Sequence, residues 1–211
     1  MIKKRMKILF IGFGNVAKEM ARIFTERKLY PALDISPEVI GIFTKRHGGL
    51  ENSSGICLDT VLTELRQNDR LAADERELSP LTPLEAAEKL DYDVLVELSS
   101  LSISGKGEPA VSHIRAALKR GKSVASANKG PVGFHYRELR DLAEENGALY
   151  LFESAVMDGA PVFNFCRRCM KGATITGFSG ILNGTTNFIL SHMEGGGSLE
   201  EGIKTAQEAG I

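Results

Sequence analysis

Three small residues near the amino terminus have the spacing of a phosphate-binding turn. Gly12, Gly14 and Ala17 follow the apolar run 8–11 in a G-x-G-x-x-A pattern and lead into residues with helical periodicity. In such a turn the first glycine permits a tight bend, the second lets the backbone approach a pyrophosphate, and the third small residue lets helix and strand pack closely. The flanking strand and helix favour dinucleotide binding over a glycine turn without a ligand. The candidate cofactor contacts here are Gly12, Phe13, Gly14, Asn15 and Val16.

A lysine beyond another expected strand is the candidate catalytic residue. Lys129 follows the sequence SAN at 126–128, directly after a strand expected at 123–126. A lysine beside a nicotinamide can hold a substrate carboxylate or carbonyl, or transfer a proton. An exposed lysine at such a place is usually only a solvated charge. The spacing alone therefore leaves both interpretations open.

Basic residues after the second expected strand indicate which nicotinamide cofactor is preferred. NAD-specific folds place an Asp or Glu at the carboxyl end of this strand, where it binds the ribose hydroxyls. Here the strand 38–43 is followed by Thr44, Lys45 and Arg46, and Glu38 lies at its other end. Arg46, helped by Lys45, can bind a 2′-phosphate through charge-assisted hydrogen bonds. We therefore predict NADP as the cofactor, with NAD as the alternative.

The elements that must position these residues alternate between strand and helix. Buried strands are expected at 8–11, 38–43, 93–98, 123–126 and 149–152, with helices after the first turn and at 59–67, 82–90, 108–120 and 136–146. Asp59 or Thr60 is the expected cap of the helix 59–67, and 44–55 reads as a loop. Ser99 and Ser100 begin a polar loop at a strand's carboxyl end, where ligands bind in open α/β sheets. The pattern predicts a doubly wound parallel sheet, the Rossmann fold, to about residue 152.

The pattern changes in the last quarter of the chain. A loop is expected at 153–161, then a helix at 162–170, a longer strand at 173–182, a helix at 183–193 and a last helix opened by a capping box at 198–201. The strand 173–182 would need sheet partners from another part of the protein. We assign 1–135 to a dinucleotide-binding domain and 136–211 to the first part of an α+β substrate and dimerisation domain.

Composition narrows the classes of partner. The 211 residues are 43% apolar and 25% charged, with a formal net charge of −1, which argues against a nucleic-acid surface. The apolar run 8–11 is too short for a membrane span, so no membrane partner is expected. Three cysteines, an odd number, fit a reducing cytoplasm. Cys166 and Cys169 form a C-x-x-C without a second pair, which favours packing over metal binding.

The chain resembles the homoserine dehydrogenases in four motifs that occur in the same order. They are GFGNVA at 12–17, SANK at 126–129, ESAVMDGAP at 153–161 and GILNGTTN at 180–187. The last motif is specific, whereas the first is shared by many dehydrogenases. The resemblance implies NAD(P)-dependent interconversion of aspartate semialdehyde and homoserine, on the route to threonine and methionine. It therefore also implies a small-molecule substrate. Because the expected strand 173–182 has an unpaired apolar edge, we expect a homo-oligomer that associates through the second domain.

The same resemblance assigns site residues. Asn128 and Lys129 correspond to the junction of cofactor and substrate. The turn near the nicotinamide corresponds to Asn183, Gly184 and Thr185. The loop that binds a monovalent cation such as Na⁺ or K⁺, chiefly through backbone oxygens, corresponds to Glu153, Val156, Asp158 and Ala160. Asp158 departs from the Gly or Ala that is usual there, which affects the expected cation site.

The sequence AQEAGI at 206–211 resembles the beginning of the family's most diagnostic stretch, which continues into acidic residues and an acid–base lysine. We expect this chain to represent the front two-thirds of the enzyme, to bind cofactor, and to oxidise homoserine poorly by itself. A non-catalytic NAD(P)-binding protein is the alternative of another class. Another small amino-acid dehydrogenase of this build is the second alternative. An aspartate-semialdehyde type would need a cysteine nucleophile, and no cysteine lies by the motif loops.

Overall fold

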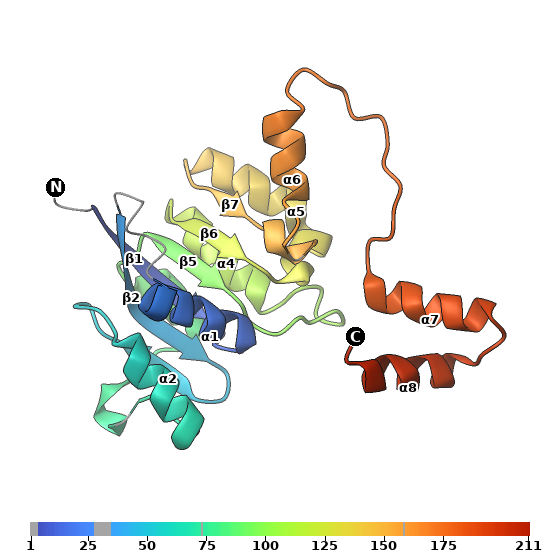
Figure 1. Cartoon of the computed structure of the whole chain (residues 1–211). Coiled ribbons are helices and arrows are strands. Elements are labelled where there is room, and N and C mark those ends of the chain that lie inside the picture. The colour runs from blue at the N-terminus through green and yellow to red at the C-terminus, as the bar shows by residue number, and fades with distance from the viewer. Residues whose placement is uncertain (1–3, 28–34, 73, 158) are drawn as a thin grey trace. The chain divides into compact units, whose positions relative to one another are not determined.

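The computed structural model describes residues 4–27, 35–72, 74–157 and 159–211. The chain divides into two compact units, 1–159 and 160–211, each of which is considered by itself (Figure 1). The units divide later than the boundary expected after residue 135. That position lies inside α5 (Lys129–Glu145), which packs against α4 (Ala110–Lys119) within the first unit.

In the part of the chain that the structure describes, seven strands form one sheet in the order β4-β3-β2-β1-β5-β6-β7. The parallel strands are β1 (Lys4–Ile11), β2 (Ile35–Thr44), β5 (Val94–Glu97), β6 (Ser123–Ser126) and β7 (Tyr150–Leu151). Two antiparallel strands, β3 (Gly48–Glu51) and β4 (Leu78–Ser79), extend the β2 side. The doubly wound sheet is therefore confirmed. The loop expected at 44–55 is partly wrong, because β3 pairs with the end of β2.

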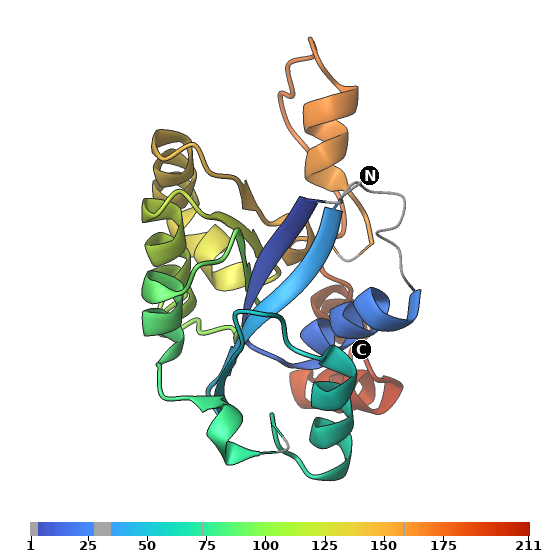
Figure 2. The same cartoon turned by 90° about the vertical axis from the view of Figure 1, so that its left-hand side faces the viewer.

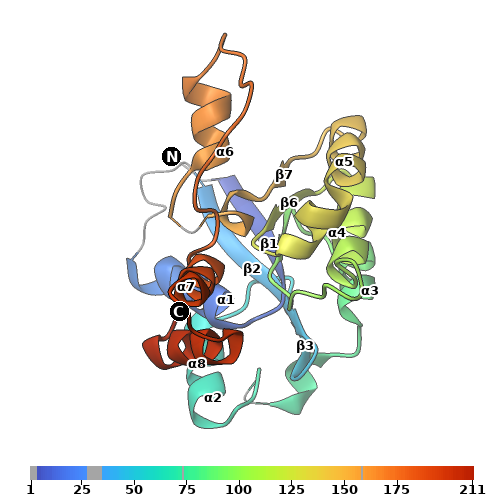
Figure 3. The same ribbon diagram turned by 90° about the vertical axis from the view of Figure 1, so that its right-hand side faces the viewer.

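Helices cover both faces of this sheet. α1 (Asn15–Arg22) and α2 (Leu58–Gln67) lie on one face, and α3 (Pro83–Lys89), α4 and α5 on the other (Figures 2 and 3). A parallel sheet covered on both faces needs apolar strands, and residues 8–11 of β1 are accordingly at most 1% exposed. None of the described helices has the length and apolar character needed to span a bilayer.

Local sequence signals predict the first residue of some helices correctly and that of others wrongly. The expected helix at 82–90 is observed as α3 and begins with a capping box, in which the Glu85 N–H donates to Thr82 Oγ1 over 3.2 Å and the Thr82 N–H donates to Glu85 Oε2 over 3.0 Å. The predicted cap of α2 is wrong. That helix begins at Leu58 after Cys57, whose side chain makes no capping hydrogen bond. α5 begins at Lys129, before the expected start at 136, and its backbone is non-helical only at His135.

The second unit is helical. α6 (Val162–Asn164) continues into a π-helical turn (Phe165–Cys169), and α7 (Gly184–Glu194) packs against α8 (Leu199–Ala209). The strand predicted at 173–182 is wrong, since this segment is neither helix nor strand. A strand needs partners for its backbone N–H and C=O groups, and no strand among the described residues pairs with it. Its apolar side chains are exposed, Phe178 by 84%.

Candidate cofactor site

A cleft of about 240 Å³ opens where β1, β5 and β6 end. β1 lies in the middle of the sheet, with β2 on one side and β5 on the other, so the strand order reverses at this point. Ligands of open α/β sheets bind in the crevice at such a reversal, beyond the carboxyl ends of the strands. The lining residues are Gly14, Asn15, Val16, Ala17, Leu98, Ser99, Leu101, Ala127, Asn128 and Lys129.

The turn after β1 requires glycine at its first position. Gly12 has a φ of +90°, and its N–H donates to the Phe43 carbonyl over 2.8 Å. A Cβ at this position would lie 2.4 Å from the carbonyl carbon of Leu98. Both the backbone angle and the neighbouring chain therefore exclude a side chain, as the motif predicts. Gly12 and Leu98 are therefore in close backbone contact. This contact holds the end of β1 against the loop after β5, and so brings two walls of the cleft together.

Gly14 meets a different environment, which fits a bound pyrophosphate. A Cβ built on Gly14 would meet no atom within 4 Å, so the turn faces open space. α1 starts there without a side-chain cap, which leaves backbone N–H groups for a ligand. The Phe13 ring is turned away, since it is only 7% exposed and packs edge-on against Phe10 with 5.7 Å between ring centroids. Phe13 therefore offers the cleft no side chain.

The opposite wall carries the polar groups. The Asn128 side chain, 5% exposed, donates from Nδ2 to the Ser99 carbonyl over 3.0 Å. Its Oδ1 accepts the Gly130 N–H over 3.1 Å and so caps α5. Lys129 is the first residue of α5 and is exposed at the rim of the cleft. Ser100 is exposed and does not line the cleft.

Three lining residues carry no polar signal, and sequence reasoning missed them. They are Leu98, Leu101 and Ala127. Ala127 lies inside the SANK motif and Leu98 directly precedes Ser99, so their position just after strand ends was the available signal. The Leu101 side chain is 48% exposed and gives the wall an apolar surface against which a flat ring could pack.

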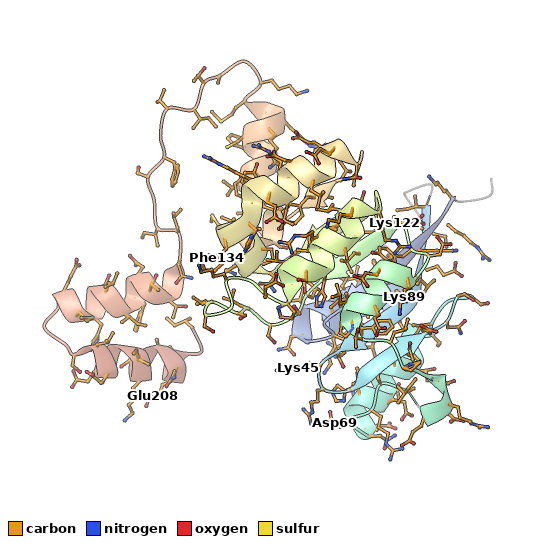
Figure 4. All side chains as sticks on the ribbon, turned by 180° about the vertical axis from the view of Figure 1, so that it is seen from behind. Lys45, Asp69, Lys89, Lys122, Phe134 and Glu208 are labelled. Carbon is orange, nitrogen blue, oxygen red and sulfur yellow. The ribbon has the colours of Figure 1, made fainter. Side chains whose placement is uncertain are left out.

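Lys45 and Arg46 lie in the turn between β2 and β3, outside the cleft lining. The Arg46 guanidinium donates a hydrogen bond to the carboxylate of Asp69, and both side chains are more than half exposed. His47 Nε2 lies 3.7 Å from the same carboxylate. Lys45 and Asp69 are labelled in Figure 4. Arg46, the residue expected to bind the 2′-phosphate, therefore has an acidic partner. The sequence did not indicate this pairing, because Asp69 lies 23 residues further along the chain.

The motif residues 183–185 belong to the second unit and are described within that unit alone. Asn183 caps α7 by accepting the Thr186 N–H over 2.8 Å, and Gly184 and Thr185 follow it in the second unit. Their role near the nicotinamide stays a prediction.

The cation loop also stays a prediction. Glu153 begins a 3₁₀ turn (Glu153–Ala155), Val156 is 36% exposed, and Ala160 is the first residue of the second unit. Asp158 lies outside the described residues. Among the residues that are described, no group of three or more His, Cys, Asp and Glu side chains could hold a metal ion. A site built mainly from backbone oxygens would not need such a group.

Comparisons with known proteins cover both units. Residues 12–153 match the family model described as "Homoserine dehydrogenase, NAD binding domain", and residues 161–211 match the one described as "Homoserine dehydrogenase". A hyperthermophilic archaeal homoserine dehydrogenase in complex with NADPH has a similar structure, with a TM-score of 0.82 and 28% identity. That likeness covers 98% of this chain and 61% of the archaeal chain.

Curated relatives agree with these matches. An NAD(+)-dependent homoserine dehydrogenase of Pseudomonas canavaninivorans is 33% identical over 97% of this chain and 58% of its own length. The homoserine dehydrogenase of Methanocaldococcus jannaschii is 30% identical over 98% of this chain and 61% of its own length. The chain therefore spans about three-fifths of the length of these relatives. On the family match to residues 12–153, the chain belongs to the homoserine dehydrogenase family.

Proposed function

We propose that this chain binds NADP(H) as the cofactor-binding part of an enzyme that interconverts L-aspartate 4-semialdehyde and L-homoserine. The observation that carries the proposal is the cleft at the reversal of strand order, bounded by a glycine turn on one side and by Asn128 and Lys129 on the other. When bound, the cofactor exchanges a hydride with the substrate carbon that carries the hydroxyl or aldehyde oxygen. The names of the relatives support a nicotinamide cofactor, NAD(+) in one relative and NADPH in another, and homoserine as the substrate.

The chain's own residues have separable tasks in this reaction. Gly14 leaves room for the pyrophosphate, and the uncapped start of α1 donates N–H groups to it. Asn128 fixes the first turn of α5 and so positions Lys129 at the rim. From there the Lys129 ammonium can hold the substrate oxygen or relay the hydroxyl proton. A non-catalytic cofactor-binding protein would need the first two tasks and not the third.

Other parts of the proposal rest on separate observations. Self-association through the second unit is supported by the exposed apolar side chains of Phe178, Ile181, Leu182 and Leu190. A monovalent cation at the loop of Glu153 and Val156 is supported by the motif alone. A cytoplasmic location fits the free cysteines, of which Cys57 and Cys169 are exposed.

The preference for NADP(H) rests on Arg46 and can be tested directly. Fluorescence titration of the chain should show tighter binding of NADPH than of NADH. Arg46→Ala should weaken NADPH binding by about tenfold or more, the scale of a charge-assisted hydrogen bond, and should change NADH binding by less than about twofold. Arg76→Ala is a matched control, because Arg76 also pairs with a neighbouring aspartate and lies outside the cleft lining. Equal or tighter binding of NADH by the unmodified chain would contradict the preference.

A further inference from the structure

A fully buried carboxylate adjoins Leu98 and Ser99, two residues that line the cleft. Glu97 is the last residue of β5, and its side chain is 0% exposed. Carboxylates are almost never buried to this extent unless other groups compensate the lost hydration. Its position is therefore unlike that of an ordinary surface glutamate.

Only one of the two oxygens of this carboxylate makes hydrogen bonds to the described residues. Oε1 accepts the Ser99 N–H over 3.2 Å and also a hydrogen bond from the Ser99 hydroxyl. The Nδ1 atom of His113, on α4, lies 3.7 Å from Oε1. Oε2 has no hydrogen-bond partner among the described residues, and the same holds for His113 Nδ1. The hydrogen bonds of Glu97 are thus directed to one residue, Ser99.

Ser99 connects Glu97 to the polar wall of the cleft through a further hydrogen bond. Its carbonyl accepts from Asn128 Nδ2, and Asn128 Oδ1 in turn accepts the Gly130 N–H. The Asn128 N–H donates to Ser126 Oγ over 3.1 Å, and Ser126 is the neighbour of Glu97 in the β5–β6 register. A continuous set of hydrogen bonds therefore runs from Glu97 through Ser99 and Asn128 to the first turn of α5.

The direction of the cofactor across the sheet gives this network a task. In a doubly wound fold the adenosine half lies towards the second strand and the pyrophosphate lies on the glycine turn. Because β5 and β6 are on the other side of β1, the nicotinamide half must extend over Ser99 and Asn128. A carboxylate that only stabilised the turn after β5 would hold Ser99 without affecting one half of the cofactor more than the other.

We propose that Glu97 is a positioning residue for the nicotinamide half of the cofactor, acting through Ser99 and Asn128. It touches neither cofactor nor substrate, and it orients the wall on which the nicotinamide and its ribose rest. This inference deepens the proposed function and rests on it.

The test compares two ligands on two variants of the whole chain. NADPH occupies both halves of the site, whereas adenosine 2′,5′-bisphosphate occupies only the adenosine half. Glu97→Met keeps the length of the side chain and removes the acceptor. It should weaken NADPH binding by about tenfold and leave binding of the bisphosphate within about twofold. Glu97→Gln retains an acceptor oxygen for Ser99 and should restore most of the NADPH affinity.

Each result supports or overturns the inference. Equal losses for both ligands would mean that Glu97 only supports the fold, and unchanged NADPH binding by Glu97→Met would mean that it positions nothing. If Glu97→Met does not fold, Ser99→Ala replaces it, because Ser99 is only half-buried. Loss of NADPH affinity with retained bisphosphate affinity then supports the inference, together with faster hydrogen exchange at the Gly130 amide. Unchanged exchange at that amide overturns it. If the unmodified chain binds neither ligand, the proposed function fails, and the inference fails with it.

Discussion

Asp69 is the residue that most directly modifies the expected cofactor preference. Its carboxylate pairs with Arg46 and would stand close to a 2′-phosphate bound there. Asp69→Asn should therefore tighten NADPH binding, by roughly two- to fivefold given that an exposed ion pair is worth about 0.2–1 kcal/mol, and should leave NADH binding unchanged. Asp74→Asn, which removes the partner of Arg76, is the control for titrations of both cofactors. A weaker affinity of Asp69→Asn for NADPH would show that the carboxylate helps to present Arg46.

Lys129 can be tested by turnover in a form of the protein that oxidises homoserine. Lys129→Met should reduce the rate by roughly 10²-fold or more, the scale of a positioned acid–base group, while cofactor affinity changes little. Lys119→Met is the control, since Lys119 is exposed on α4 and lies outside the cleft lining. Near-normal turnover by Lys129→Met would show that Lys129 is only a solvated surface charge.

Single residues differ in how far the sequence reveals them. Gly14 comes from one motif, Asn128 and Lys129 come from another, and all three line one cleft because the carboxyl ends of parallel strands meet at one edge of the sheet. The pairing of Arg46 with Asp69 and that of Asn128 with Ser99 join positions 23 and 29 residues apart. No local pattern reports such contacts, so they required the structure.

At the level of the elements, the junction of α3 with β5 depends on a buried phenol. Tyr92 is 0% exposed, and its hydroxyl donates to the Ala87 carbonyl over 2.7 Å. Burial raises the pKa of Tyr92 to about 12, partly offset by the nearby charge of Arg120. Arg120 also binds the carbonyls of Ala87 and Leu90, at the end of α3.

The raised pKa of Tyr92 predicts a loss of stability in alkali. The neutral phenol is favoured in the folded chain, so its contribution is complete below the unfolded pKa of about 10 and is lost between pH 10 and about 12. One proton corresponds to at most about 1.4 kcal/mol per pH unit. Denaturant unfolding across pH 8–12 should show this decline, and Tyr92→Phe should make its slope shallower. Burial, and then the charge of Glu97, raises the pKa of Tyr150 too, so the part of the decline that belongs to Tyr150 remains. An identical slope in Tyr92→Phe would contradict the assignment.

Elements with strong local signals were predicted correctly, and those that depend on partners were not. β1, its glycine turn and α1 follow from apolar periodicity and small residues, and α3 follows from its capping box. β3 is four residues long, contains two glycines and exists through its pairing with β2, which gives little local signal. The segment 173–182 is the reverse case, with a strong local signal and no partner. Its alternation of apolar and polar residues is typical of a strand, and no described strand pairs with it.

At the scale of the molecule, the described residues form a seven-stranded sheet with its helices in the first unit and helices alone in the second. The sheet and its two helical layers account for the buried apolar core, whereas the large apolar side chains of the second unit are mostly exposed. Sequence reasoning recovered the dinucleotide fold because each strand–helix step is local. In the second unit it recovered the helices at 162–169, 184–194 and 199–209 and failed at 173–182, where no described strand provides a partner.

The central claim is that the chain binds a nicotinamide cofactor in the cleft beside Gly14. The most direct measurement is calorimetric titration of the chain and of Gly14→Val with NADPH. A Cβ at position 14 meets no atom within 4 Å, so we expect the variant to keep its thermal unfolding temperature and its side chain to fill the place of the pyrophosphate. We predict saturable binding with one site per chain, and a loss of about 10²-fold or more in Gly14→Val, since two or more phosphate hydrogen bonds are removed. No binding by the unmodified chain, or equal binding by the folded variant, would contradict the account.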